Sequence, residues 1–410
     1  LCSNPKTRET WADVKAQAAA VGIARSAYLP TLSATWQSVR EKSTTHVDST
    51  PKAISEMSAT VRTESLTWNW LLYDFGAREA NLKNANALFN AARATQNATL
   101  QAIFAATAKD YTATQAAMGA LLAAQEVERM TYESMIAAQA RVDRGIAPIT
   151  DALQAQTQHE EAVYSLTKAQ SDAQSALGTL AIDMNLSPDV PLEVPPVTDT
   201  TLPGRDFNES ISELIRQVKE AHPAVRAAQS QYEASLAKVD QTRAQGLPTI
   251  SNIASYTQND RPMSLSMGLP MNPANSRDAY IGVQVSIPIF EGFGRHYQIR
   301  EAEAQAERQA GVLEETRQQV ALDVWSSYQT LIESTRNTEN SANLQAIAQR
   351  SWEAAKHRYD TGVGNILELM STQATLANAK QRHIHALASW NNARVDFAAK
   401  LGWLNAMDLQ

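Results

Sequence analysis

The chain has 410 residues with a formal net charge of −7; 44% of the residues are hydrophobic and only 6% are aromatic. Scarce glycine and aromatic residues are typical of long helices rather than of a thick globular core, and the net negative charge disfavours nucleic acid as a partner. A single cysteine excludes an internal disulfide framework, and no apolar run reaches the roughly 18 residues that a membrane-spanning helix needs.

The N-terminal segment predicts a helix over about residues 4–27, which Pro30 ends. Two segments follow, at about 30–42 and 60–74, in which apolar and polar residues alternate. Alternation with a period of two predicts strands, so this part of the chain is expected to form an antiparallel hairpin of two long strands. Ser, Thr, Gln and Asn occupy the polar positions.

Long helices are predicted after the hairpin. Residues 76–144 contain no proline and almost no glycine, which predicts a helix on the order of 100 Å long. Leu100, Tyr111 and Gln125 belong to a series at alternating steps of four and three, which predicts a coiled-coil seam. A turn and a return helix at about 150–181 complete the first unit, residues 1–185.

The chain then repeats this unit, and internal repetition is the strongest signal in the sequence. Pro5 aligns with Pro223 at an offset of 218, and Arg141 aligns with Arg358 at an offset of 217. A proline-rich linker is expected at 186–206, between the first unit and the second, residues 207–410. Further expectations for the second unit are strands at about 248–259 and 279–290, a long helix at about 295–359 and a return helix at about 365–401.

The two units differ at their beginnings. An amphipathic helix containing Leu214 and Val218 precedes Pro223, and the first unit lacks a counterpart. The chain is therefore expected to start some 15 to 20 residues late relative to the repeat. Cys2 aligns with Glu220 inside this helix, which favours an incidental helical cysteine over a lipid-attachment site.

Two interpretations of the strands are open: a soluble sheet that covers a core, or a membrane barrel with lipid outside and water inside. The uncharged polar faces favour the barrel. Four strands are too few, because a closed barrel needs about eight and an open edge in lipid is costly. Several chains must then share one barrel. Its expected lipid-facing positions are Trp36, Trp68, Trp70, Ile281, Val283 and Val285.

The duplicated blocks resemble the TolC-like outer-membrane efflux proteins over essentially the whole chain. The similar segments are AYLPTLS, WNWLLYDFGAR, GLPTIS, VSIPIFEGFGR, RGIAPITDAL and TGVGNILELMSTQ. The resemblance implies a mixed α/β membrane protein of the Gram-negative outer membrane, a homotrimer with a twelve-stranded β-barrel and a twelve-helix periplasmic α-barrel.

The implied function is that of a passive exit duct of a tripartite efflux pump. Such a duct docks a periplasmic adaptor and an inner-membrane transporter. Two alternatives remain, a type I protein-secretion duct of the same family and a soluble coiled-coil protein such as the adaptor itself. The cargo is not specified by the sequence.

The resemblance also assigns roles to the two helical turns. Thr150, Asp151 and Tyr359 match positions that link neighbouring hairpins in a periplasmic gate, and Glu368 matches an acidic ring. Gly364 replaces the family's arginine partner, so the lock is expected to be weak. The tips expected to dock the adaptor are Arg144, Gly145, Ile146, Thr361, Gly362, Val363 and Gly364. Plainer alternatives are a simple turn for the glycines and a helix N-terminal acid for Asp151.

Catalysis and metal binding find little support in the sequence. His383 and His385 lie two residues apart on a predicted helix and therefore face different directions. His159 is followed by Glu160 but lacks a second histidine one turn away, which a zinc-protease helix needs. No enzymatic activity, cofactor or metal site is expected.

Overall fold

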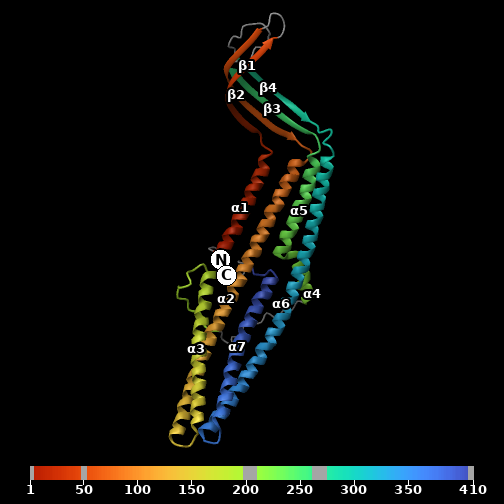
Figure 1. Ribbon diagram of the computed structural model, residues 1–410. Helices are drawn as coiled ribbons and strands as arrows, with labels where there is room; N and C mark the ends of the chain where they lie inside the picture. Colours follow the sequence, from red (N-terminus) through yellow and green to blue (C-terminus); the bar gives the residue numbers. More distant parts are fainter. Residues whose placement is uncertain (1–3, 48–52, 197–209, 261–274, 405–410) are drawn as a thin grey trace. The chain divides into compact units, whose positions relative to one another are not determined.

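The computed structural model of the protein describes residues 4–47, 53–196, 210–260 and 275–404 (Figure 1). Cys2 lies outside these ranges, as does the part of the expected linker beyond residue 196. The chain forms two compact units, one of Val14–Ala91 and Ala228–Val312, the other of the remaining segments. None of the helices in the described ranges combines the length and hydropathy needed to cross a membrane.

The described helices repeat in length. Two helices have 22 residues, two have 67 and two have 35. In chain order the helices are α1 (Pro5–Ser26), α2 (Ala77–Asp143), α3 (Ile149–Asp183), α4 (Ile211–Ala221), α5 (Pro223–Ala244), α6 (Gly294–Asp360) and α7 (Ile366–Lys400). The short helix α4 is the amphipathic segment before Pro223, and the Ser210 side chain caps it by accepting from the backbone N–H of Glu213.

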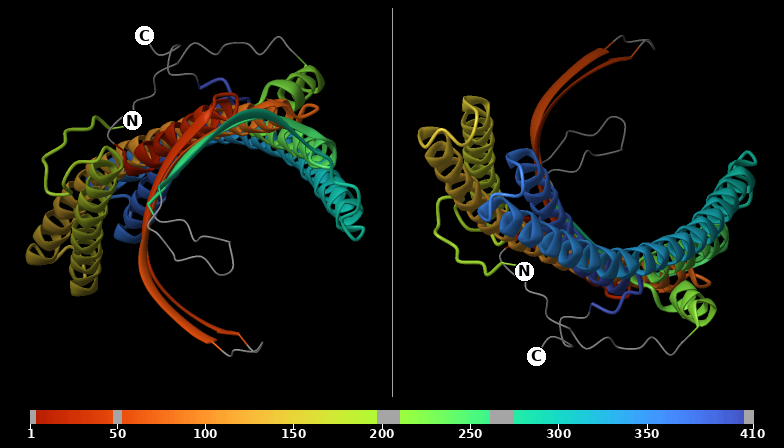
Figure 2. Two further views of the ribbon diagram at one scale, coloured as in Figure 1. Left: turned by 90° about the horizontal axis from the view of Figure 1, so that it is seen from above. Right: turned by 90° about the horizontal axis from the view of Figure 1, so that it is seen from below.

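Four antiparallel strands form one sheet in the order β1-β2-β3-β4. Figure 2 shows them bending together as a single curved layer. The outermost strands, β1 and β4, each pair with one neighbour in this chain. The strands are β1 (Thr31–Val47), β2 (Ala53–Tyr73), β3 (Thr249–Asp260) and β4 (Asn275–Ser286).

Strand boundaries differ from the sequence-based expectations. Strands β1 and β2 extend beyond the expected ends near residues 42 and 60, because their backbone pairing continues from Ser43↔Met57 to Val47↔Ala53. A ladder of backbone hydrogen bonds does not require apolar side chains. The fourth strand ends at Ser286 rather than near 290, because Pro288 has no N–H to donate to a ladder.

The register of the sheet separates its two faces. Directly paired residues share a face. Leu32 pairs with Trp68, Trp68 with Ala254, and Ala254 with Ile281. Every second residue along a strand lies on the same face. All six expected lipid-facing side chains therefore lie on the face that these pairs share. The opposite face carries Ser33, Thr67, Ser255 and Gln284, among others.

Two helical hairpins make up much of the other unit. The C-terminal part of α2 turns into α3, and the C-terminal part of α6 turns into α7 (Figure 1). Small and polar residues pack between the helices: the Thr114 hydroxyl contacts the backbone carbonyl of Ala176 at 3.2 Å, and Ser341 contacts His383 at 3.1 Å. We call α2/α3 the first hairpin and α6/α7 the second hairpin.

Candidate functional site at the ends of the helical hairpins

Both hairpins end in the same turn. Gly145 and Gly362 have φ angles of 73° and 86°, a left-handed conformation that glycine adopts without steric cost. The N–H of Gly145 donates to Val142 O at 2.8 Å, and the N–H of Gly362 donates to Tyr359 O at 3.0 Å. The next N–H groups also bond: Ile146 N–H donates to Arg141 O, and Val363 N–H donates to Arg358 O. The two bonds together form a Schellman motif in each repeat.

The side chains that follow the two glycines project into solvent. Ile146 is 69% exposed and Val363 is 73% exposed. Arg144 and Thr361 are also exposed. Gly364 is the exception: an added Cβ would lie 2.9 Å from the backbone nitrogen of Tyr359, so this position requires glycine for close backbone approach. The tips therefore present one apolar side chain each at the end of a tightly bonded turn.

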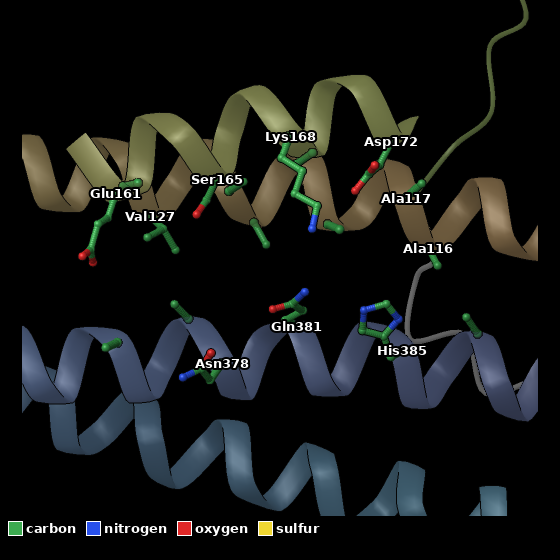
Figure 3. Close-up of a pocket in the computed structure, with 18 of the residues that line it drawn as sticks. Ala116, Ala117, Val127, Glu161, Ser165, Lys168, Asp172, Asn378, Gln381 and His385 are labelled. Atoms are coloured by element: carbon green, nitrogen blue, oxygen red, sulfur yellow. The ribbon is translucent and has the colours of Figure 1, made fainter. Parts of the chain in front are cut away.

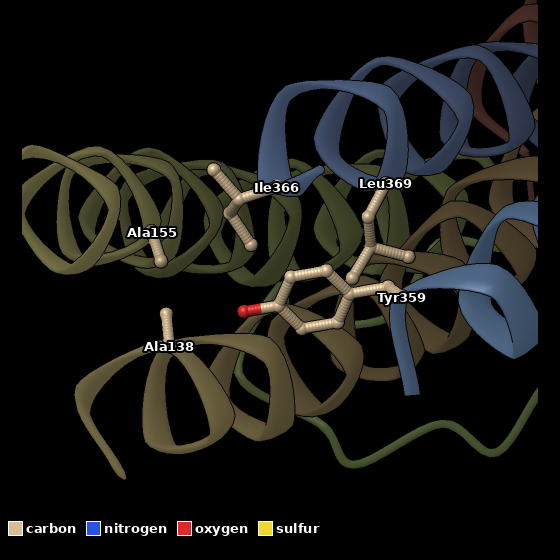
Figure 4. Close-up of a cluster of buried hydrophobic side chains, with 5 residues drawn as sticks. All are labelled: Ala138, Ala155, Tyr359, Ile366 and Leu369. Atoms are coloured by element: carbon tan, nitrogen blue, oxygen red, sulfur yellow. The ribbon is translucent and has the colours of Figure 1, made fainter. Parts of the chain in front are cut away.

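Tyr359 links the two hairpins of one chain. Its side chain is 3% exposed and belongs to a cluster with Ala138, Ala155, Ile366 and Leu369. Figure 4 shows the ring inserted between the hairpins, with its hydroxyl directed towards Ala138 and Ala155. Burial raises the pKa of the Tyr359 hydroxyl; the nearby Arg141 charge opposes this shift, whereas Asp151 adds to it.

Arg141 makes contacts to Tyr359 that sequence reasoning missed. Its guanidinium carbon lies 4.1 Å from the centre of the Tyr359 ring, and its NH2 group donates to the backbone carbonyl of Tyr359. One side chain on α2 thus holds both the ring and the backbone at the end of α6. A signal was present, because Arg141 recurs in the repeat as Arg358.

The remaining expected gate residues lie nearby in the first turns of α3 and α7. Thr150 is exposed and Asp151 is partly buried. On α7 the Asn365 side chain caps the helix by accepting from Glu368 N at 2.7 Å, and the Glu368 carboxylate lies 3.6 Å from Arg358 NH2. The structure brings Tyr359 within electrostatic reach of Asp151, whereas Glu368 pairs within its own hairpin.

A groove runs along the hairpins above the tips. It has a volume of about 690 Å³ and is lined by α2, α3 and α7. Alanine residues form much of its lining, and polar side chains such as Lys168, Gln381 and His385 project into it (Figure 3). Within the described ranges, no group of three or more His, Cys, Asp or Glu residues is arranged to hold a metal ion.

Comparison with known proteins identifies the class. The family model described as "Outer membrane efflux protein" matches residues 1–182 and 214–402. Protein CyaE of Bordetella pertussis is 29% identical over 406 residues, covering 98% of this chain and 82% of that protein. Outer membrane efflux protein BepC of Brucella suis is 25% identical over 378 residues, covering 91% of this chain and 77% of that protein.

Solved structures show the same fold. The outer membrane protein VceC from Vibrio cholerae matches with a TM-score of 0.81 at 16% identity, covering 98% of this chain and 94% of that one. A fold of two repeats, each with a strand pair and a long helical hairpin, thus defines a TolC-like outer-membrane factor. The chain belongs to the outer membrane efflux protein family, whose members are channels of the Gram-negative outer membrane that extend into the periplasm. This finding excludes the alternative of a soluble periplasmic adaptor.

Proposed function

We propose that the protein is a trimeric channel-tunnel that serves as the passive exit duct of a tripartite efflux pump. The observation that carries this proposal is the sheet. It has four strands, two outer edges, one apolar face and one polar face. Three copies supply twelve strands, enough to close a barrel and pair every edge. The apolar face then meets lipid and the polar face lines the lumen.

Exposure on the apolar face supports this arrangement. Ile281 is 79% exposed, Val283 is 64% exposed and Trp36 is 67% exposed. A row of large apolar side chains with this exposure marks a surface that another molecule or a membrane covers. Outer-membrane lipid is the partner that fits strands of this kind.

The helical hairpins supply the periplasmic end of the duct in this proposal. Arg144, Ile146 and Val363 at the exposed tips dock the adaptor, and the adaptor connects the duct to an inner-membrane transporter. Thr150, Asp151 and Tyr359 hold the closed gate, with Glu368 forming an acidic ring just inside it. The Asp151→Ala, Tyr359→Phe double variant is expected to raise single-channel conductance in planar bilayers, and unchanged conductance would refute these gate assignments.

An efflux role agrees with the printed descriptions of the family model and of BepC. The test is deletion of the gene that encodes this chain, followed by measurement of both antibiotic susceptibility and the set of secreted proteins. Increased susceptibility with an unchanged secretome supports the efflux duct. Loss of a secreted protein with unchanged susceptibility supports the alternative. The purified protein should also run as a trimer in detergent.

A further inference from the structure

A buried amide lies in the packing between the two hairpins of one chain, which we call the inter-hairpin seam. Gln373 on α7 is 2% exposed, and neither its side-chain oxygen nor its side-chain nitrogen has a hydrogen-bond partner among the described residues. Buried amides usually have such partners, because burial removes their hydrogen bonds to water. An amide whose bonds to water are not replaced destabilises the packing that buries it.

The position of Gln373 on α7 places it inside an apolar face. Leu369, Gln373 and Leu376 follow one another at steps of four and three residues, so they share one face of the helix. Leu369 belongs to the cluster of Tyr359, which includes residues of α2 and α3. Leu376 belongs to a second cluster, which includes Met130 of α2. Gln373 therefore interrupts an apolar face that packs on the first hairpin.

A second buried polar group lies in the same layer of the seam. Trp352 of α6 packs against both clusters, so its side chain spans the stretch in which Gln373 lies. The indole nitrogen of Trp352 is buried and has no hydrogen-bond partner within the described part of the chain. The Lys356 ammonium lies 5.3 Å from the centre of the Trp352 ring, a contact with the ring face that leaves the N–H group unused. The second hairpin thus brings two such groups into one layer.

The repeat provides an internal reference for this glutamine. Gln156 on α3 is the equivalent of Gln373 at the offset of 217, and it is exposed. An exposed amide keeps its hydrogen bonds to water, so Gln156 does not destabilise the first hairpin. The equivalent of Trp352 is Met135, which has no side-chain N–H group. The buried amide is therefore a property of the second hairpin and not of the repeat.

We propose that Gln373 weakens the inter-hairpin seam, so that the two hairpins can separate while their helices stay folded. The Gln373 amide gains hydrogen bonds to water when the hairpins separate, and this difference shifts the equilibrium towards the separated arrangement. Burial of Leu369 and Leu376 opposes the shift and favours the packed arrangement. This inference rests on the proposed periplasmic gate and adds a residue that controls how readily the hairpins part.

Thiol labelling in the purified protein measures how often the seam opens. In a Cys2→Ser background, Ala155→Cys is the reporter, because Ala155 on the first hairpin is 1% exposed and shares a cluster with Tyr359 and Ile366 of the second. A maleimide reaches this thiol when the hairpins part. Gln373→Met keeps the length of the side chain and removes the amide. It should slow labelling roughly tenfold, because the packed seam no longer contains that unpaired amide.

Two further variants serve as controls. Gln156→Met should leave the labelling rate of Ala155→Cys unchanged, because Gln156 is exposed. At pH 8, Gln373→Glu should accelerate labelling at least tenfold, because a buried carboxylate without a partner destabilises the packed seam more than an amide does. Circular dichroism should show the same helical content in every variant. If Gln373→Glu loses helical content, the Gln373→Met variant decides the question alone.

The outcomes separate this inference from the proposed function. Slower labelling in Gln373→Met, with no change in Gln156→Met, supports the inference. Equal rates in Gln373→Met and the unaltered reporter protein overturn it, as does equal slowing by the two Met variants. Single-channel recording then tests the proposed gate by itself. Fewer opening events in Gln373→Met support the gate, whereas unchanged opening refutes it and leaves the weakened seam intact.

Discussion

The guanidinium of Arg141 lies 4.1 Å from the centre of the Tyr359 ring and also donates to the Tyr359 backbone carbonyl. One side chain of the first hairpin therefore contacts both the ring and the backbone carbonyl of Tyr359 at the end of the second hairpin. A cation–π contact with partly desolvated partners contributes roughly 0.5–2 kcal/mol, and a charged hydrogen bond contributes about 1.5–3 kcal/mol. Contacts of these magnitudes are large enough to hold the end of the second hairpin against the first.

We expect Arg141→Gln to raise single-channel conductance in planar bilayers, because the second hairpin loses both contacts and separates more easily from the first. Arg144→Gln is the matched control, since Arg144 is exposed at the same tip and its loss should leave conductance unchanged. The same conductance for Arg141→Gln as for the unaltered protein would show that this contact does not restrain the duct.

The proposed ring of Glu368 carboxylates leads to a prediction about ion selectivity. Glu368→Gln should reduce cation selectivity and block by multivalent cations, because clustered carboxylates attract cations. Arg358→Gln should act in the opposite direction, since the arginine lies 3.6 Å from this carboxylate and offsets its charge. Reversal potentials in asymmetric salt measure both effects. Shifts of the same sign in the two variants would contradict the proposed ring.

Docking at the tips predicts that Gly145→Val and Gly362→Val abolish transport while the trimer still forms. An added Cβ at either glycine has nothing within 4 Å, so the substitution projects into solvent; the left-handed backbone adds a cost of about 1–2 kcal/mol. Gly311→Val is the control, because Gly311 also meets open space but lies far along α6 from the tip. Transport by both tip variants at the normal rate would exclude this docking surface.

The membrane-facing assignment predicts a strong difference between adjacent residues. Val283→Arg should prevent assembly of the heat-stable oligomer, at a cost of about 2–4 kcal/mol per chain if the site is deep in the bilayer. Gln284→Arg should be tolerated, because its side chain lies on the polar face. Val283 and Gln284 are both exposed in the isolated chain. A soluble sheet would therefore tolerate both changes equally.

The pH dependence of stability should reveal the carboxyl pair at the far end of α3. A hydrogen bond to Asp183, reinforced by burial, raises the pKa of Asp110 from 3.8 to about 6. The folded state therefore holds the proton more tightly than the unfolded chain. The stabilisation of the fold by the protonated Asp110 carboxyl is fully present below about pH 3.8, and it is lost as the pH rises through about 6.

Asp110→Asn, which mimics the protonated carboxyl, should raise the thermal midpoint in detergent at pH 8 and change it little at pH 4. Asp172→Asn on α3 is a surface control that should change neither midpoint. An equal effect of Asp110→Asn at both pH values would contradict the elevated pKa.

Repetition made much of the helical architecture predictable, because glycine turns and proline stops recur at a fixed offset. The residues against which each helix packs were harder to predict from the sequence. The predicted seam included Thr114, which is 0% exposed, but it also included Tyr111, which is 40% exposed, and it left out Thr112, which is 8% exposed. Thr114 contacts α3 and Thr112 contacts Asn392 of α7, and a single heptad seam cannot describe a helix with two partners.

The contact between Arg141 and Tyr359 could not be predicted for a related reason. Both residues stood out, one as part of the repeated turn and the other as a matched gate position. Arg141 and Tyr359 are 218 residues apart in the sequence. This spacing does not indicate whether Arg141 or its repeat equivalent Arg358 faces the Tyr359 ring. Only the packing of one hairpin on the other distinguishes Arg141, which covers the ring, from Arg358, which lies near Glu368.

The starting positions of equivalent helices show where the two repeats differ in length. Helix α5 starts 218 residues after α1, whereas α6 starts 217 after α2 and α7 starts 217 after α3. The slip therefore occurred in the strand hairpins, whose members have 17 and 21 residues in the first copy and 12 each in the second. The net change there is one residue, while the helices kept their length. Paralogues of this chain should accordingly diversify in length at the strand end and remain in step along the helices.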